Sequence, residues 1–178
     1  MKEIQQYCAF LRGVNTGGRP MKMADVVQVF EKAGMKNVKS VLATGNIIFS
    51  SEKSPETLKE NLEKDLSESF NYDAFLFIKT DGEVNEILTN NPFITAENFH
   101  VYTFVTLLGE ETHLQKIFNE SIHTEGEEAK TVGTNFYWKI PKGDTLNSTF
   151  GKILGRKDLK AKITSRNINT IDKIVKKF

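Results

Sequence analysis

The sequence is poor in cysteine, proline, histidine and tryptophan, and it has no long hydrophobic run. Its 178 residues include one cysteine, four prolines, three histidines and one tryptophan. A single cysteine, Cys8, cannot form an internal disulfide, and this is typical of proteins kept in a reducing compartment. No stretch approaches the ~20 apolar residues that span a bilayer, and the residues after Met1 lack the apolar core of a signal peptide. We therefore expect a cytoplasmic protein without membrane contacts.

The scarcity of histidine and cysteine also bears on catalysis. His100, His113 and His123 have neither the spacing of a zinc-binding helix nor paired cysteines beside them. His113 lies next to an apolar helix position and is expected to be solvated or to cap the helix, and no nucleophile elbow is present. The sequence predicts no metal and no cofactor, and it leaves open whether the protein is an enzyme.

The numbers of basic and acidic residues are nearly equal. The 24 basic and 23 acidic residues give a formal net charge of +1. General binding to duplex nucleic acid usually requires a clearly basic domain, so any anion site must be local. The 39% hydrophobic and 26% charged content is ordinary for a folded protein.

The apolar pattern of the first half predicts six elements. They are a strand over 5–11, a helix with an apolar face from Met23 to Ala33, strands over 38–44 and 46–50, a helix starting at Ser54-Pro55, and a strand over 72–78. This order of strand, helix, strand, strand, helix, strand is that of the ferredoxin-like βαββαβ unit.

The same order recurs further along the chain. The pattern predicts strands over 101–108, 128–132 and 135–140, a helix face at Leu114, a helix carrying Phe150, Ile153 and Leu154, a strand near 162–164, and a final helix from about 167. We therefore predict an α+β fold of tandem, duplicated ferredoxin-like βαββαβ halves with antiparallel sheets. The halves comprise residues 1–80 and 98–178, the latter with the C-terminal helix, and residues 81–97 form a connector helix and loop.

The predicted topology brings two polar loops together. In a ferredoxin-like half the sheet order is 4-1-3-2, and right-handed crossovers make the first two strands run the same way. Their C-terminal ends share one edge of the sheet, so the loop 12–19 should meet the turn Thr44-Gly45-Asn46. Asn46 should lie near Arg12 or Gly13.

The loop 12–19 holds three glycines, one asparagine and two arginines just before a helix. Backbone N–H groups at a helix start and arginine side chains both favour anions. The sequence therefore predicts a site for a small phosphate-containing ligand, such as a nucleotide, formed by Arg12, Asn15, Gly17, Gly18, Arg19, Lys22 and Asn46. Arg166 and Asn167 do not follow from this topology, and they are added to the site because they open another predicted helix of the same polar character. A structural alternative is that the glycines only shape a turn, the asparagines cap backbone groups and the arginines pair with carboxylates.

Three stretches resemble the signatures of a widespread bacterial family known as a domain of unknown function. Leu11 to Gly18 resembles its LRG[IV]NxGG motif, Leu42 to Phe49 is similar to its SGNVxF stretch, and Thr164 to Thr170 is similar to its TARNWxT stretch. Here Ile168 replaces the usual tryptophan. Lys22 is matched to a family lysine although the preceding segment is one residue shorter. The resemblance implies a duplicated ferredoxin-like fold but no reaction.

Other functions remain open. An enzyme of unrecognised reaction could use arginine and asparagine donors for electrostatic stabilisation. RNA binding on an aromatic sheet face, or a protein-interaction module, is a further possibility. However, runs such as Phe75-Leu76-Phe77-Ile78 are apolar at successive positions, which predicts that both sheet faces are covered. Nucleic acid binding is therefore possible but not favoured, and the sequence does not indicate an oligomeric state.

Overall fold

The computed structural model describes residues 3–15, 20–94 and 96–178. In these residues the chain forms two four-stranded antiparallel sheets, five α-helices and two short 3-10 helices. Its contacts divide it into two compact units, Met1–Asn85 with Lys173–Phe178, and Glu86–Asp172. Within the described residues, no helix has both the length and the apolar character needed to cross a membrane.

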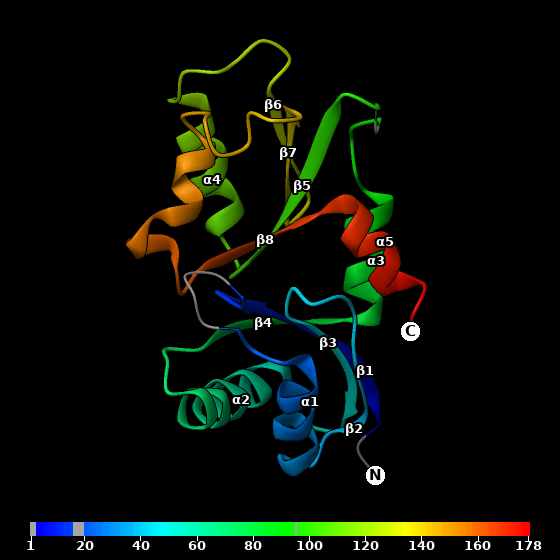
Figure 1. Cartoon of the computed structure of the whole chain (residues 1–178). Helices are drawn as coiled ribbons and strands as arrows, with labels where there is room; N and C mark the ends of the chain where they lie inside the picture. The colour runs from blue at the N-terminus through cyan, green and yellow to red at the C-terminus, as the bar shows by residue number, and fades with distance from the viewer. Residues whose placement is uncertain (1–2, 16–19, 95) are drawn as a thin grey trace. The chain divides into compact units, whose positions relative to one another are not determined.

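The first unit contains one sheet with two helices packed on one of its faces (Figure 1). The strand order is β2-β3-β1-β4, which confirms the order predicted from the sequence. The elements are β1 (Gln5–Arg12), α1 (Met23–Lys32), β2 (Lys36–Ser40), β3 (Asn46–Ser51), α2 (Pro55–Phe70) and β4 (Phe75–Thr80). Both neighbours of each inner strand are antiparallel to it, so β1 and β2 run in the same direction.

The helices of the first unit pack as the apolar spacing predicts. Val26 and Phe30 of α1 and Leu58, Leu62 and Leu66 of α2 are buried against the sheet. The Ser54 side chain accepts a hydrogen bond from the Thr57 N–H, and Pro55 occupies the first helical position of α2. This start follows from the sequence because serine caps and proline tolerates the first turn.

Several strand boundaries of the first unit differ from the prediction, and two of the differences have a local explanation. β2 ends at Ser40, not Thr44, so residues 41–45 form a wider turn in which Leu42 has a φ of 61°. The Asn46 amide spans this turn, because it donates to the Val41 carbonyl and to the Thr44 hydroxyl. β4 starts at Phe75, later than predicted, after Asn71 ends α2 in the left-handed conformation.

The second sheet has the order β6-β7-β5-β8. The elements from Asp81 onward are α3 (Asp81–Thr89), β5 (Phe99–Thr106), α4 (Glu110–Asn119), β6 (Glu128–Val132), β7 (Asn135–Pro141), the 3-10 helices η1 (Gly151–Gly155) and η2 (Lys157–Leu159), β8 (Ile163–Asn167) and α5 (Ile168–Val175). A cluster of aromatic side chains, Phe104, Phe118, Phe136, Trp138 and Phe150, fills the core of this unit.

The predicted helix carrying Phe150, Ile153 and Leu154 is wrong, because this region forms two 3-10 helices. Gly151 approaches the Thr145 carbonyl so closely that a Cβ would lie 1.8 Å from that oxygen, and its N–H bonds to the Ser148 hydroxyl. Only glycine fits at this position, because any side chain would overlap the Thr145 carbonyl. The last strand is longer than predicted and includes Arg166 and Asn167, and α5 begins directly after it at Ile168, which confirms the helix predicted from about residue 167.

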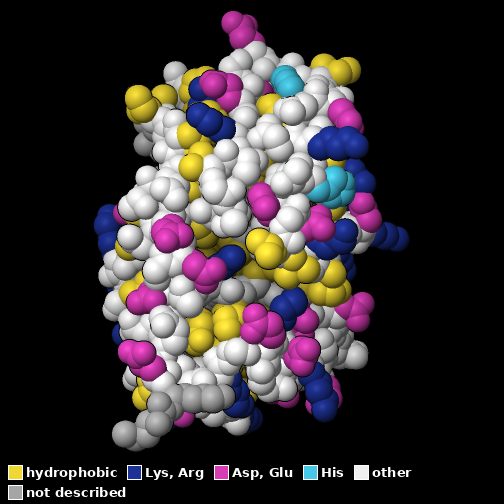
Figure 2. Space-filling view, turned by 180° about the vertical axis from the view of Figure 1, so that it is seen from behind, with side chains coloured by type: hydrophobic (Ala, Val, Ile, Leu, Met, Phe, Trp, Pro, Cys, Tyr) yellow, Lys and Arg dark blue, Asp and Glu magenta, His cyan; other side chains and the backbone are white. Residues whose placement is uncertain are grey.

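The visible surface carries mixed charge. Figure 2 shows basic and acidic side chains interspersed over this face, without a broad region of one sign. This mixture agrees with the net charge of +1.

Candidate functional site

The end of β1 lies beside the turn that precedes β3. Phe10 pairs with Asn46, and the Leu11 N–H donates to the Gly45 carbonyl at 2.8 Å. Asn46 is therefore the partner of Phe10, which lies two positions before Arg12. This pairing confirms the prediction that the end of the first strand meets the turn 44–46. We call this region the loop edge: Arg12 to Asn15, Met21-Lys22 and residues 41–46.

Asn15 connects the two loops of this edge. Its amide nitrogen donates to the Ala43 carbonyl at 2.7 Å, and its side-chain oxygen accepts the Met21 N–H at 2.7 Å. The second bond closes the loop between residues 15 and 21. Asn15 also has a φ of 56°, a conformation that asparagine tolerates better than most residues.

Asn46 and Gly45 shape the neighbouring turn. Asn46 is fully buried, and its amide nitrogen donates to the Val41 carbonyl at 3.0 Å and to the Thr44 hydroxyl at 2.9 Å. Gly45 has a φ of +77°, and a Cβ there would lie 2.9 Å from the Val14 Cγ2 atom. These contacts give both residues a role in positioning the turn.

The two cations of the loop edge have different environments. Arg12 ends β1 opposite Phe75 and is half-buried, and the loss of water lowers the pKa of its guanidinium group. Lys22 is exposed, stands directly before α1 and makes no side-chain cap of that helix. The predicted site residues Gly17, Gly18 and Arg19 lie outside the described residues.

Arg166 and Asn167 lie in the second unit. The Arg166 side chain is 9% exposed and donates to the Thr164 hydroxyl at 2.9 Å and to the Ser165 carbonyl at 2.8 Å. The Asn167 side-chain oxygen accepts the Asn169 N–H at 2.9 Å, which caps α5, and its amide nitrogen is 3.3 Å from His100 Nδ1. Each of these contacts holds the junction between β8 and α5.

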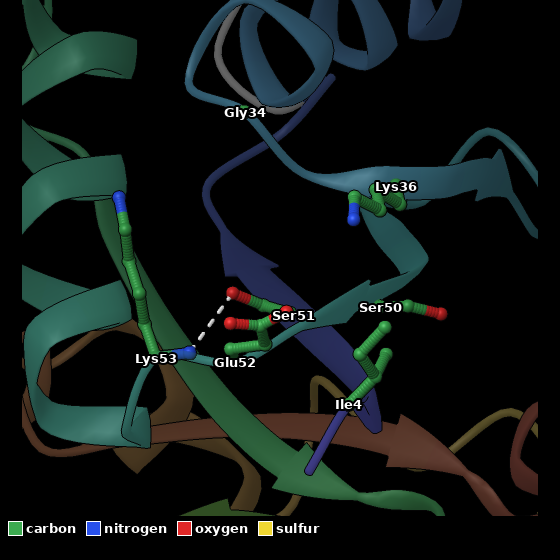
Figure 3. Close-up of a pocket in the computed structure, with 7 residues that line it drawn as sticks. All are labelled: Ile4, Gly34, Lys36, Ser50, Ser51, Glu52 and Lys53. Carbon is green, nitrogen blue, oxygen red and sulfur yellow. Dashed lines mark hydrogen bonds between the residues drawn. The ribbon is translucent and has the colours of Figure 1, made fainter. Parts of the chain in front are cut away.

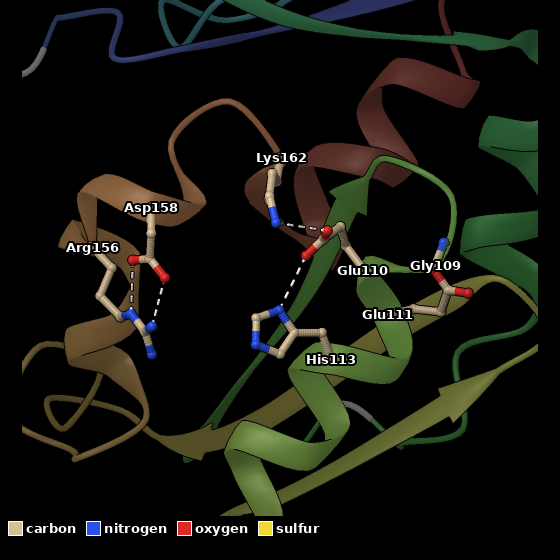
Figure 4. A network of polar contacts seen from close by, with 7 residues as sticks. All are labelled: Gly109, Glu110, Glu111, His113, Arg156, Asp158 and Lys162. Atoms are coloured by element: carbon tan, nitrogen blue, oxygen red, sulfur yellow. Dashed lines mark hydrogen bonds and ion pairs between the residues drawn. The ribbon is translucent and has the colours of Figure 1, made fainter.

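Sequence reasoning missed a polar network at the start of α4 (Figure 4). The Glu110 carboxylate lies 3.2 Å from His113 Nδ1 and 3.1 Å from Lys162 Nζ. Burial raises the pKa of the Glu110 carboxyl, but the bonds from His113 and Lys162 outweigh it and leave that pKa below its usual range. From the sequence, only the spacing of Glu110 and His113 could have indicated this polar network, because Lys162 comes from a distant segment. In the described part of the chain, no three histidine, cysteine or acidic side chains form a group suited to a metal ion.

A second feature without a sequence signal is a pocket of about 260 Å³ at the other end of the first sheet (Figure 3). It is lined by Ile4, Gly34, Lys36, Ser50, Ser51, Glu52 and Lys53. Gln5 of β1 pairs with Ser51 of β3, so this pocket lies at the start of β1 and the loop edge lies at its end.

The aromatic residues of β4 are not presented as a stacking surface. Leu76 is 0% exposed and Phe77 is 2% exposed, and Phe75 and Ile78 are partly buried. The prediction that these residues are covered is therefore confirmed.

Comparisons with known proteins place the chain in a group without an assigned function. Its fold is similar to that of a solved structure, the conserved bacterial protein SP0830 from Streptococcus pneumoniae, with a TM-score of 0.78, 22% sequence identity and 98% of each chain covered. At this identity the likeness concerns the fold alone. No curated protein matches the chain. The model of the family "Protein of unknown function (DUF1697)" matches residues 4–137, so the chain belongs to this family.

Proposed function

We propose that the loop edge of the first unit binds a small anionic ligand that carries a phosphate group, such as a nucleotide. The observation that carries this proposal is the double hydrogen bond of Asn15, to Ala43 and from Met21. It ties together two loops and holds both ends of a segment that contains Gly17, Gly18 and Arg19, between the partly desolvated Arg12 and the exposed Lys22.

The residues of the site have separate roles in this proposal. Arg12, Arg19 and Lys22 supply positive charge, and Gly17 and Gly18 supply backbone N–H groups at the approach to α1. Asn15 and Asn46 position the loops through the bonds described above. Arg166 and Asn167 belong to the second unit, where they bond within β8 and cap α5, so the proposed site does not include them.

The strand orders support treating the halves as copies of one ferredoxin-like unit. Each sheet has its first strand in the centre beside its third, with the second and fourth at the edges. On this view the segment after β5, Leu107-Leu108-Gly109, is the counterpart of the glycine loop after β1. It contains no cation, so the duplicated halves would carry one anion site, in the first unit. The buried Cys8 supports a reducing, cytoplasmic setting.

Isothermal titration with inorganic phosphate and with nucleoside monophosphates tests this proposal. We expect Arg12→Ala to weaken binding by ~1.5–3 kcal/mol, the usual loss for a charge-assisted hydrogen bond, with a smaller loss for Lys22→Ala. Lys64→Ala removes the same charge from an exposed position of α2 and should leave binding unchanged. If Arg12→Ala lowers the melting temperature but binds phosphate as the wild type does, Arg12 has a structural role and the site is refuted.

A further inference from the structure

One edge of the second sheet is formed by β6, a regular strand that forms a hairpin with β7 (Figure 1). The two strands pair without a bulge over five consecutive residues of β6, from Glu128 to Val132. They are joined by the two-residue turn Gly133-Thr134, in which Gly133 has a φ of +60°. In such a hairpin the two residues that flank the turn, here Val132 and Asn135, exchange both of their backbone hydrogen bonds. This pair sets the direction of every backbone group along β6.

Ala129 and Thr131 direct their backbone groups toward the free side of β6. Hydrogen-bonded and non-hydrogen-bonded pairs alternate along an antiparallel ladder. Val132, Lys130 and Glu128 therefore bond to β7, and the two residues between them face outward. Among the residues that the structure describes, no protein group bonds to the backbone N–H and C=O groups of Ala129 and Thr131. This edge thus offers a row of donors and acceptors to another strand.

The other edge strands carry features that hinder such pairing. β2 has a bulge between Lys36 and Lys39, and both lysines are exposed. The backbone of β4 at Leu76 is bonded by two side chains of α2. At β8 the Ser165 carbonyl accepts a hydrogen bond from a side chain of the same strand. Bulges, lysines and covering side chains commonly protect sheet edges from other chains. Along β6, the described residues form neither a bulge nor a side-chain bond to the outward backbone groups.

The charges of β6 favour one register between two copies of this strand. Glu128 and Lys130 are both exposed, and they lie on the same face of the strand because they are two residues apart. If Ala129 lies opposite Ala129 of a second copy, each Glu128 lies directly opposite a Lys130. These are non-hydrogen-bonded positions, at which opposing side chains come closest. The neighbouring registers, centred on Glu128 or on Lys130, place like charges opposite each other, which is destabilising.

We propose that the second unit binds a second copy of this chain by antiparallel pairing of the two β6 strands about a two-fold axis at Ala129. The two Ala129 residues exchange both backbone hydrogen bonds across the axis. Two pairs of Glu128 and Lys130 flank the axis and determine the register. The two four-stranded sheets thereby join into one continuous sheet. All of these residues belong to the second unit, so the pairing is independent of the loop edge.

Sedimentation equilibrium of the full chain, over a concentration series up to roughly 1 mM, tests this proposal. The series extends this far because two short strands form a small interface and associate weakly. We expect the wild type to dimerise reversibly, and less strongly as the salt concentration rises. Hydrogen exchange at the Ala129 and Thr131 amides should slow as the dimer forms.

Two charge reversals test the register. Lys130→Glu and Glu128→Lys each convert both opposite-charge pairs into like-charge pairs, and each should raise the dissociation constant by roughly tenfold or more. Glu128→Lys also removes the pair that Glu128 forms with Lys139, but an exposed pair contributes little to stability, so we expect both variants to melt close to the wild type. Lys152→Glu makes the same charge change at an exposed position of η1 and should leave association unchanged.

An equimolar mixture of Lys130→Glu and Glu128→Lys is the sharpest test of this pairing. In the mixed dimer each charge again faces the opposite charge, so the mixture should associate although each variant alone associates poorly. A wild type that stays monomeric throughout the series overturns the proposal. So does dimerisation of Lys130→Glu equal to that of the wild type, or a mixture that associates no better than its two components.

Discussion

The side-chain oxygen of Asn15 accepts the backbone N–H of Met21 at 2.7 Å, while the amide nitrogen of the same side chain donates to Ala43. One side chain thus bonds to Met21, six residues further along the chain, and to Ala43 in the turn before β3. Neither bond follows from local propensity alone, because Ala43 lies in another loop. The position of the proposed anion site depends on this residue.

Replacing Asn15 should therefore loosen the loop edge. Asn15→Gly removes both hydrogen bonds but tolerates the φ of 56°, and we expect the free energy of unfolding to fall by roughly 1–3 kcal/mol. Asn15→Ala should cost about 1 kcal/mol more, because a Cβ is strained at that φ. Urea unfolding monitored by circular dichroism measures both values.

Asn15→Asp provides the matched control, because it keeps the acceptor for Met21 and loses only the donor to Ala43. Its stability should lie between those of the wild type and Asn15→Gly. If Asn15→Gly unfolds with the same urea midpoint as the wild type, the hydrogen bonds of Asn15 do not stabilise the loop.

A second prediction separates backbone strain from steric overlap at two glycines. Gly45 and Gly34 have similar φ values, +77° and +87°, but only at Gly45 would a Cβ meet neighbours, Val14 at 2.9 Å and Leu11 at 3.0 Å. Gly34→Ala should lower the free energy of unfolding by ~1–2 kcal/mol from strain alone. Gly45→Ala should lose a further ~1–3 kcal/mol from overpacking. Equal losses in thermal and urea unfolding would mean that Val14 and Leu11 move aside without cost.

The sequence was most informative where periodicity and chain handedness act together. The apolar faces of α1 and α2 and the order of the elements predicted a ferredoxin-like sheet with β3 beside β1, and the structure has this pairing, with Asn46 opposite Phe10. The width of the 41–45 turn could not be predicted, because it depends on the hydrogen bonds that the Asn46 side chain makes back across the turn.

Packing between distant segments explains the remaining differences. The region around Phe150 has the apolar spacing of an α-helix but forms 3-10 turns, and Gly151 there packs against the carbonyl of Thr145 from the preceding loop. Likewise, the pocket at Lys36 and Lys53 is lined by three short stretches of the chain, none of which has a recognisable sequence signal by itself. Sequence patterns predict faces of elements better than they predict where element ends converge.

Acid should weaken the second unit through Glu110. The pKa of its carboxyl lies below the ordinary value of about 4.3, so the unfolded state binds a proton more readily than the folded state. The stability that Glu110 contributes is fully present above the ordinary pKa and is lost as the pH falls through the lower, folded-state pKa. Glu110→Gln should therefore show a smaller loss of melting temperature than the wild type over this acidic range.

Glu120→Gln is the control for this pH series. Glu120 directly follows α4. Its side chain is 67% exposed, and its carboxylate oxygen lies 4.0 Å from Lys116 Nζ. Its replacement should leave the acid profile as in the wild type. Parallel profiles for the wild type and Glu110→Gln would mean that His113 and Lys162 do not stabilise the ionised carboxylate.

The last prediction concerns the exposed edge of the first sheet. β4 is an edge strand, and two side chains of α2 satisfy the backbone of its residue Leu76. Glu63 accepts the Leu76 N–H at 3.0 Å, and Lys59 donates to the Leu76 carbonyl at 2.8 Å. Lys59 and Glu63 also pair with each other, and Lys59 Nζ lies 5.0 Å from the centre of the Phe77 ring. The pair thus occupies the position that a further strand would take.

Glu63→Ala should lower the free energy of unfolding by roughly 1–2 kcal/mol, because the Leu76 N–H loses its acceptor. The uncovered edge should also increase aggregation near the unfolding midpoint, since unpaired strand edges recruit other chains. Glu60→Ala, at an exposed position of the same helix, should change stability by less than about 0.5 kcal/mol. A double-mutant cycle with Lys59→Ala then measures the coupling, expected at about 0.5 kcal/mol or more because the two side chains share Leu76. Strict additivity in urea unfolding, with no added aggregation by light scattering, would show that the two residues do not protect this edge together.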